Sequence, residues 1–304
     1  MFDIVSVGHL SLDSIFLPDR STPFVVLGGS AAYASFAARR LGATVSVVSK
    51  VGGDFPSAYL WWLGQEGIDL SGVVKAESSQ STRFELKYSK NFSNRNLRLK
   101  NKAPPITLSD LPKSLKAKTI HIAPIAGEIS YETVEKLRGC AELLSLDPQG
   151  LVRYFDEKGN VTSGSLADKR ILELVNIFKS SSDEIKAATD MSNLKSAIKA
   201  VHDYGVETVI VTLGTKGAVL SIKGTAYTIP AYKSEKVVDP TGAGDVFIGS
   251  FLAEYIRGEN LLWCACVGSA AASLVVEALG PTFFGSKTEI YRRALVLYEK
   301  EIKR

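Results

Sequence analysis

The sequence predicts an α/β protein with a central, mostly parallel sheet. Short apolar runs that end in glycine or proline recur along the chain and alternate with stretches of helical periodicity. These runs are apolar at successive positions, as in strands that helices cover on both faces. The chain has 304 residues, of which 45% are hydrophobic, enough for one large core. We therefore expect a three-layer αβα domain.

The expected strands and helices follow one another along the chain. Strands are predicted at Asp3–Gly8, Thr44–Gly52, Thr119–Pro124, Glu142–Pro148, Thr208–Gly214 and Glu235–Asp239. Helices are predicted at Ser30–Leu41, Ser57–Glu66, Tyr131–Arg138, Asn193–Tyr204, Ala243–Arg257, Leu261–Leu279 and Lys287–Lys303.

Two segments break this rhythm and predict a second, smaller sheet. Polar and apolar residues alternate through Ser81–Lys102, which indicates an antiparallel hairpin with one face in water. Ser14–Gly29 contains two further short runs of strand character. We expect these inserts, at approximately 13–29 and 80–103, to form a β-sheet lid on a single domain that spans residues 1–304.

Charge and composition exclude several classes of protein. A net charge of +4 is far from the strong basic bias of nucleic-acid-binding proteins. Three cysteines without CxxC spacing argue against a disulfide framework and a zinc site. The longest uncharged apolar run, Leu261–Val276, has 16 residues, whereas a membrane helix needs about 20. With no secretion signal at the N-terminus, we expect a cytoplasmic protein that binds neither nucleic acid nor membranes.

The segment "VVDPTGAGDVFIGSF", which begins at Val237, places glycines and carboxylates at the start of a predicted helix. Small residues let backbone N–H groups approach a ligand, and the helix dipole adds positive potential. Gly242, Ala243 and Gly244 therefore predict an anion hole for a phosphoryl group. Asp245 would accept a proton from a hydroxyl that attacks this group. Together they predict a compact phosphotransfer site.

Other interpretations of this loop explain less of it. The P-loop sequence G-x-x-x-x-G-K-[ST] does not occur in the chain. The dinucleotide fingerprint G-x-G-x-x-G fails at Phe247, which disfavours a nicotinamide oxidoreductase. A glycine-rich turn with Asp245 as the helix cap explains the glycines, but it does not explain a carboxylate where an anion would dock.

Three motifs in order resemble those of the ribokinase-like (PfkB) carbohydrate kinase family. "DPTGAGD" resembles its C-terminal signature, Gly28–Asp54 its N-terminal signature, and Val211–Ala218 its nucleotide-binding turn. The resemblance covers the whole chain. It implies a ribokinase-like fold and a kinase that uses ATP and Mg²⁺, with K⁺ as an activating cation in some members.

The resemblance also implies roles for individual residues. Asp245 matches the catalytic base, and Gly242, Ala243 and Gly244 match the anion hole. Asp239 and Thr241 match positions that help bind a monovalent cation in some members. The residues that match contacts to ATP are Thr212, Gly214 and Gly217, and those that match contacts to substrate are Ser11, Asp13, Gly28 and Gly29.

Two positions depart from the family pattern. The family often has an Asn-x-x-Glu motif near the phosphates, and here Ser181 stands where Asn is expected while Glu184 keeps the acid. We expect Glu184 to hold Mg²⁺ through water. Tyr33 stands where the N-terminal signature usually carries an Asn that reaches the sugar. A tyrosine changes the size and polarity of the pocket, which argues against ribose as the substrate.

The segment after the fourth predicted strand bears on the substrate. Asp147, Gln149 and Arg153 follow that strand at the carboxyl edge of the sheet, where open α/β sheets bind ligands. Such side chains suit a ring with many hydroxyls, although a capped turn with a surface ion pair explains them equally well. The segment resembles the archaeal and plant myo-inositol kinase branch of the family.

The sequence thus favours a kinase of a small polyol, with myo-inositol as the favoured substrate. A nucleoside kinase is the alternative, followed by a non-catalytic ligand-binding protein on the same fold. An exposed edge of the lid would also allow two lids to pair in a homodimer.

Overall fold

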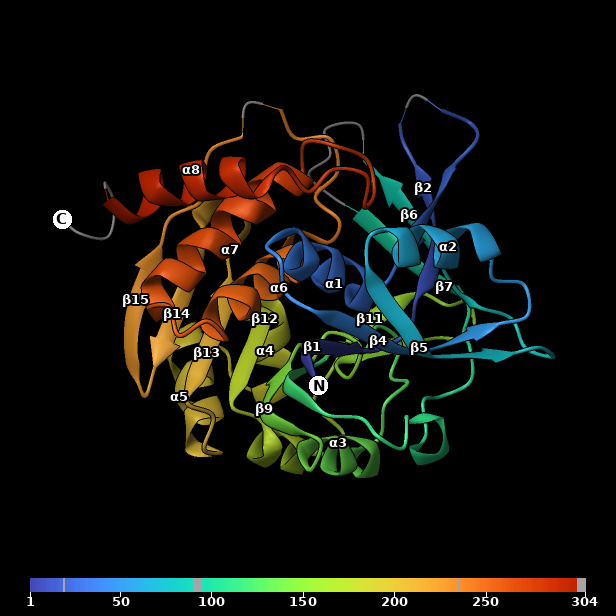
Figure 1. Cartoon of the computed structure of the whole chain (residues 1–304), viewed down its shortest axis with the longest axis horizontal. Coiled ribbons are helices and arrows are strands. Elements are labelled where there is room, and N and C mark those ends of the chain that lie inside the picture. The colour runs from blue at the N-terminus through green and yellow to red at the C-terminus, as the bar shows by residue number, and fades with distance from the viewer. Residues whose placement is uncertain (19, 90–94, 235, 300–304) are drawn as a thin grey trace.

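A nine-stranded sheet forms the centre of this computed structural model, which describes residues 1–18, 20–89, 95–234 and 236–299. Its strands are β1 (Phe2–Val7), β4 (Val45–Gly52), β5 (Ile68–Ala76), β8 (Ala117–Ile122), β9 (Ala141–Leu146), β12 (Ile177–Ser181), β13 (Thr208–Thr212), β14 (Ala218–Ile222) and β15 (Thr225–Ile229). They lie in the order β15-β14-β13-β12-β9-β8-β1-β4-β5 (Figure 1). Neighbours from β13 to β5 pair in parallel, and β14 and β15 pair antiparallel at one edge.

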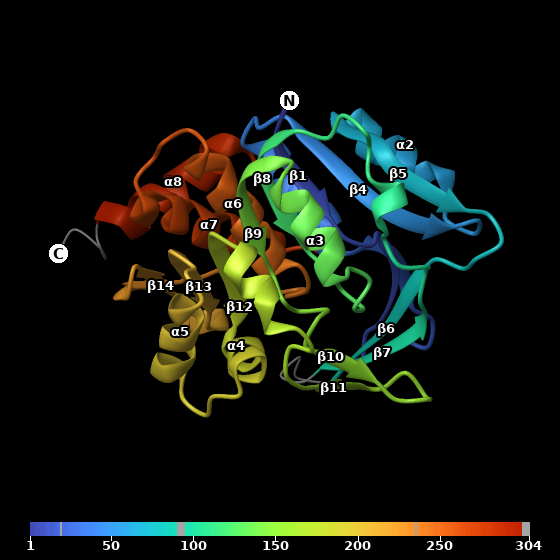
Figure 2. The same ribbon diagram turned by 90° about the horizontal axis from the view of Figure 1, so that it is seen from below.

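Helices cover both faces of this sheet (Figures 1 and 2). One layer contains α1 (Ser30–Arg40), α2 (Ser57–Gln65), α6 (Ala243–Tyr255), α7 (Leu261–Val275) and α8 (Lys287–Leu297). The other contains α3 (Tyr131–Arg138), α4 (Ser182–Thr189), α5 (Leu194–Asp203) and the 3₁₀ helix η2 (Lys169–Leu174). Short 3₁₀ turns, η1 (Leu108–Asp110) and η3 (Gly214–Lys216), lie in connections. The predicted three-layer αβα fold is confirmed.

The strand period explains why the central strands are apolar throughout. Successive side chains of a strand point to opposite faces, so in β1 Ile4 packs in the cluster beneath α6 and α7, whereas Val5 and Val7 pack beneath α3 and α4. The apolar helix α7 is buried along most of its length, as predicted for a core helix. Within the described ranges, no helix has the length and apolar composition to cross a membrane.

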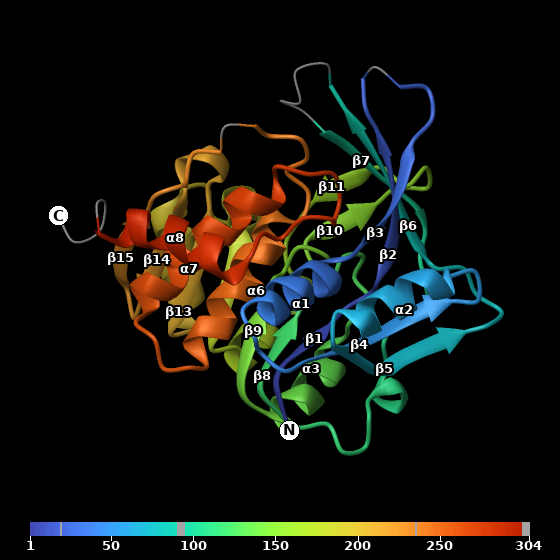
Figure 3. The same cartoon turned by 45° about the horizontal axis from the view of Figure 1, so that its top comes forward.

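A smaller sheet projects from the α/β body (Figure 3). Its strands are β2 (Ser11–Phe16), β3 (Phe24–Gly28), β6 (Thr82–Tyr88) and β7 (Arg95–Asn101), in the order β3-β2-β6-β7. Along β6, Phe84, Leu86 and Tyr88 are buried and pack with Ile125 of the body, whereas the residues between them are more exposed. A two-stranded ribbon, β10 (Arg153–Phe155) and β11 (Val161–Ser163), lies nearby.

Both predicted inserts contribute to this small sheet, although residues 90–94 of the second insert lie outside the described residues. The antiparallel pairing of β6 with β7 and the one-sided apolar pattern of β6 are confirmed. That the sheet closes over a substrate, and that two such sheets pair in a dimer, stay predictions.

Several predicted elements differ from the structure. The strand predicted at Glu235–Asp239 is wrong for residues 236–239, because the N–H groups of Val238 and Asp239 donate to the carbonyl of Val276 at 2.7 and 3.2 Å. Residue 235 lies outside the described residues. The predicted helix Leu261–Leu279 ends at Val275. The end of the predicted C-terminal helix, 300–303, also lies outside the described residues.

Candidate active site

Two cavities meet at the N-terminus of α6. The smaller, of about 70 Å³, lies between the small sheet and the α/β body, and its walls include Ser11, Asp13, Gly29, Tyr33, Gln149, Arg153, Thr241, Gly242 and Asp245. The larger, of about 650 Å³, has walls that include Thr212, Gly214, Gly217, Ala243 and Gly244. Except for Gly28, the residues predicted to contact substrate line the smaller cavity, and Thr212, Gly214 and Gly217 line the larger. The glycine loop lies between the two cavities.

The loop before α6 requires glycine for two reasons. Gly242, the N-cap of α6, has a φ of 78°, in the left-handed region that other residues rarely adopt. A Cβ at this position would lie 2.1 Å from Cδ1 of Tyr33. No side chain caps the helix, and Asp245 is its third residue, so the interpretation of Asp245 as the helix cap is wrong. The carboxylate lines the smaller cavity instead.

Asp245 is buried, with 9% of its surface exposed. Burial raises the pKa of its carboxyl from 3.8 to about 6, an effect that Asp147 reinforces and that Lys179, a hydrogen bond with Ser30, and Arg153 oppose. A carboxylate whose pKa lies just below neutral pH is largely ionised in the cell and still a useful proton acceptor. The environment of Asp245 therefore suits a general base.

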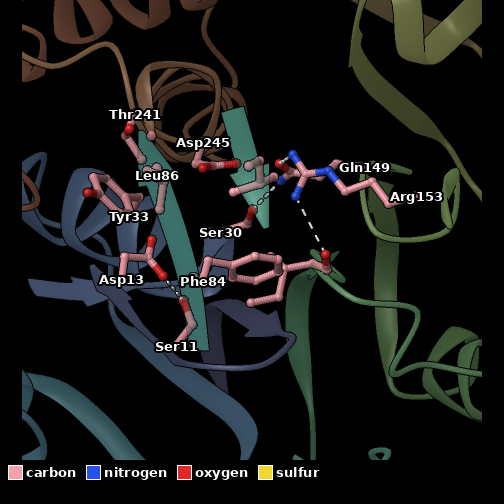
Figure 4. Close-up of a pocket in the computed structure, with 14 residues that line it drawn as sticks. Ser11, Asp13, Ser30, Tyr33, Phe84, Leu86, Gln149, Arg153, Thr241 and Asp245 are labelled. Carbon is pink, nitrogen blue, oxygen red and sulfur yellow. Dashed lines mark hydrogen bonds between the residues drawn. The ribbon is translucent and has the colours of Figure 1, made fainter. Parts of the chain in front are cut away.

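Polar groups converge on the smaller cavity from two sides (Figure 4). On one side, the Ser11 hydroxyl donates to Asp13 Oδ1 at 2.8 Å. On the other, Arg153 donates to Gln149 Oε1, and Gln149 Nε2 donates to Ser30 Oγ at 2.5 Å. The apolar wall between them consists of Phe84, Leu86, Leu97 and Ile125. Such a cavity offers hydrogen-bonding groups to hydroxyls and an apolar surface to C–H groups.

The three other predicted substrate positions differ in what they contact. Gly29 lines the cavity and has a φ of 100° at the start of α1. Gly28 does not line the cavity; a Cβ there would lie 2.2 Å from Asp13 Oδ2, so its missing side chain makes room for Asp13. Tyr33 has a buried hydroxyl with no hydrogen-bond partner among the described residues. Burial and the nearby carboxylates of Asp13, Asp239 and Asp245 raise the pKa of Tyr33 well above its usual value.

The predicted ATP contacts occupy the end of β13 and the turn that follows. Thr212, Gly214 and Gly217 all line the larger cavity. Gly217 has a φ of 89°, and a Cβ there would lie 2.0 Å from the Ile229 carbonyl oxygen, so the turn requires glycine. The volume and position of this cavity, beside the glycine loop, fit a nucleoside triphosphate whose phosphates reach the loop.

Ser181 and Glu184 form the capping box of α4, in which each side chain accepts a hydrogen bond from the other residue's N–H. Ser181 pairs in register with Thr212, so the box lies beside the predicted ATP contacts. Neither residue is among those that line the two cavities. Because Mg²⁺ is usually held by one or two carboxylates together with substrate phosphates and water, Glu184 fits the predicted role, which stays a prediction.

Asp239 holds the glycine loop in place. Its Oδ1 accepts hydrogen bonds from the Tyr88 hydroxyl at 2.6 Å and the Thr241 N–H at 2.9 Å, and its Oδ2 accepts one from the Gly280 N–H at 3.1 Å. The Tyr88 hydroxyl also lies 2.8 Å from Thr241 Oγ1. Tyr88 thereby ties the small sheet to the loop. The predicted binding of a monovalent cation by Asp239 and Thr241 stays a prediction.

Sequence reasoning missed one charged pair beside the site. Lys179 of β12 donates to Asp147 Oδ2 at 2.6 Å, and the two side chains are 6% and 1% exposed. The other oxygen of Asp147 accepts the N–H of Gln149 at 3.1 Å. Asp147 therefore does not face the cavity, and of the two interpretations of Asp147 the capped turn is confirmed. The buried ion pair of Asp147 with Lys179 was not predicted. A lysine directly after the apolar pair Ile177–Phe178 in "NIFKSSS" was the available signal.

Comparison with known proteins agrees with this geometry. The sequence matches the pfkB family of carbohydrate kinases over residues 1–288. It is 31% identical to a cytidine kinase of Thermococcus kodakarensis, over 92% of this chain and 98% of that protein. It is 28% identical to an inositol 3-kinase of Arabidopsis thaliana, over 95% of this chain and 80% of that protein.

Solved structures show the same fold. A pyrophosphate-dependent kinase of the ribokinase family, in complex with a pyrophosphate analog and myo-inositol, superposes with a TM-score of 0.80 at 22% identity, over 91% of this chain and 96% of that one. The fold and the loop at α6 define a phosphotransferase of small molecules. The chain belongs to the PfkB carbohydrate kinase family, and the predicted ribokinase-like fold is confirmed.

Proposed function

We propose that the protein is a cytoplasmic kinase that transfers the γ-phosphoryl group of ATP to a hydroxyl of a small polyol, with a cyclitol such as myo-inositol favoured. The observation that carries the proposal is the smaller cavity of about 70 Å³, which we call the acceptor cavity. In it, carboxylate, hydroxyl, amide and guanidinium groups surround Asp245. A compact ring with a hydroxyl on each carbon would use these groups. Its C–H face would pack against Phe84 and Leu86.

The proposed mechanism assigns one task to each part of the loop. Asp245 accepts the proton of the acceptor hydroxyl as its oxygen attacks the γ-phosphorus. The N–H groups of Gly242, Ala243 and Gly244 stabilise negative charge on the transferred group. Mg²⁺, when bound, neutralises phosphate charge, and Glu184 would hold it through water. The small sheet would exclude water from the site.

The larger cavity supports a nucleotide as the donor. Its volume of about 650 Å³ and its apolar walls, which include Phe247, Ala272 and Val276, suit a nucleobase. Pyrophosphate, which the structural neighbour uses, has no part that would occupy this space.

A nucleoside kinase is the second candidate. The observations that favour it are the aromatic side chains of Tyr33 and Phe84 in the acceptor cavity, together with the likeness to a cytidine kinase. A nucleoside is larger than a cyclitol, so the small sheet would have to move outward to admit the base.

A coupled assay of ADP release with cyclitols, sugars and nucleosides separates these candidates. We expect the highest kcat/KM for a cyclitol. Asp245→Asn should lower kcat by about 10²- to 10⁴-fold, the usual contribution of a general base, while calorimetry shows ATP binding retained. Asp203→Asn, which removes only an exposed ion pair with Lys199, is the matched control.

Each possible result of the assay decides a different point. A nucleoside as the best acceptor would replace the cyclitol proposal. Near-normal turnover by Asp245→Asn would refute the mechanism. No ADP release with any compound would favour a ligand-binding protein without activity.

A further inference from the structure

A buried ion pair lies directly beneath the loop that carries the proposed base. Lys179 and Asp147 come from β12 and from the end of β9, which are neighbours in the central sheet. Burial alone would lower the pKa of Lys179, but Asp147, Asp245 and Glu184 raise it above the usual value, so Lys179 is a cation. A buried pair of this kind often gives no more stability than apolar residues of the same volume. Stability alone therefore does not explain the pair.

The position of the ammonium group relative to α6 points to a role. A Cβ at Gly244 would lie 2.5 Å from Lys179 Nζ, so the ammonium group contacts the first turn of α6, one residue before Asp245. A helix N-terminus carries partial positive charge and disfavours a cation. A lysine at this place is favourable only with anions beside it, and Asp147 and Asp245 are those anions.

We propose that Lys179, held in place by Asp147, is a positioning residue that keeps Asp245 ionised and able to accept the proton of the substrate. The inference rests on the proposed function, in which Asp245 is the base. It adds a residue outside the glycine loop to the machinery of phosphoryl transfer.

The groups that surround Asp245 determine the sign of the expected effect. They are Lys179 from β12, Asp147 and Arg153 from the segment after β9, and Ser30 and Tyr33 from α1. Burial and Asp147 raise the pKa of Asp245, whereas Lys179 acts most strongly to lower it. Loss of the ammonium group would leave Asp245 facing the Asp147 carboxylate and would therefore raise its pKa.

The test is a titration of the free enzyme by NMR with ¹³C-labelled aspartate carboxyls, in which Asp245→Asn assigns the signal. Lys179→Met should raise the pKa of Asp245 by about one pH unit or more, so that the ionised form falls about tenfold at pH 5 and below. Asp147→Asn added to Lys179→Met removes both charges. Because Lys179 acts more strongly than Asp147, this double variant should titrate between the wild type and Lys179→Met.

Activity provides a second measurement. The assay uses any compound that the wild type phosphorylates. In Lys179→Met, the acid limb of the pH profile of kcat/KM should move to higher pH by the same amount as the pKa of Asp245, and turnover should recover at alkaline pH. Lys50→Met is the matched control. It removes a lysine from another partly buried ion pair, in which Lys50 Nζ lies 2.9 Å from Asp110 Oδ1, and neither residue lines a cavity described above. It should leave the titration of Asp245 unchanged.

An unchanged titration in Lys179→Met, or an equal shift in Lys50→Met, would overturn the proposal. If Lys179→Met does not fold, the double variant decides, since it removes both members of the ion pair and leaves no unpaired Asp147 carboxylate. A pKa of Asp245 no higher than that of the wild type would then overturn the proposal. The NMR titration needs no substrate. Failure to find an acceptor would therefore refute the proposed function and leave this test intact.

Discussion

The buried carboxyl of Asp245 should reduce the stability of the folded protein when it is ionised. Its pKa is raised from 3.8 to about 6, so the folded state binds the proton more tightly than the unfolded state. The stabilisation by this proton is complete below pH 4 and is lost as the pH rises through 6. Since one pH unit between two pKa values corresponds to about 1.4 kcal/mol, the full loss is about 3 kcal/mol.

Asp245→Asn has no carboxyl to ionise and should therefore be more stable than the wild type at neutral and alkaline pH. Urea unfolding without ligands measures the free energy of unfolding of both proteins between pH 5 and 8. From the linkage relation, the advantage of the variant should grow by about 1 kcal/mol over this range, towards about 3 kcal/mol at pH 8.

A second carboxylate serves as the control of opposite sign. Burial alone would raise the pKa of Asp110, but hydrogen bonds from Lys50 and Thr107 lower it. Asp110 therefore contributes stability that is present above its unfolded pKa and lost as the pH falls, and Asp110→Asn should be less stable than the wild type at pH 8. If Asp245→Asn is less stable than the wild type at pH 8, or its advantage does not change with pH, the reasoning about Asp245 is refuted.

Three further predictions concern the loop and the donor cavity. Gly242→Ala places a Cβ 2.1 Å from an aromatic ring atom and should lower the free energy of unfolding in urea by about 1–3 kcal/mol; a loss no larger than in Gly64→Ala, where the methyl meets open space, would contradict this. Tyr88→Phe removes the hydrogen bond to Asp239 and should lower the free energy of unfolding by about 1–3 kcal/mol in the same assay. An unchanged free energy of unfolding would contradict this. Ala272→Leu narrows the larger cavity and should raise the KM for ATP about tenfold. An unchanged KM would show that the adenine of ATP binds elsewhere.

The sequence predicted the fold well where strands are apolar on both faces, because helices cover both faces of these strands. It failed at β12, which reads "IFKSS" and has a lysine and two serines in five residues. It also failed at β14 and β15, because an antiparallel edge of the sheet needs no long apolar run; four of the five residues of β15 are exposed. These strands are recognisable only from their pairing with β13 and with each other.

The local part of the candidate site was also predictable. The loop Gly242–Asp245 is one continuous segment, so its glycines and its acid could be interpreted together from the sequence. The contact between Gly242 and Tyr33 joins α1 to α6 and lies beyond any local pattern. The same holds for the bond between Tyr88 and Asp239, which are 151 residues apart.

One of the strands that the sequence failed to predict, β12, also carries the lysine proposed to act on Asp245. These two facts have one cause. A residue placed for function can break the local pattern of its element, and the surrounding structure must then compensate for it. In β12, the lysine and two serines interrupt the apolar pattern, and Asp147 compensates for the buried charge. In this chain, the lysine among the strand residues of β12 therefore indicates that the strand lies near the site, not that the segment is a loop.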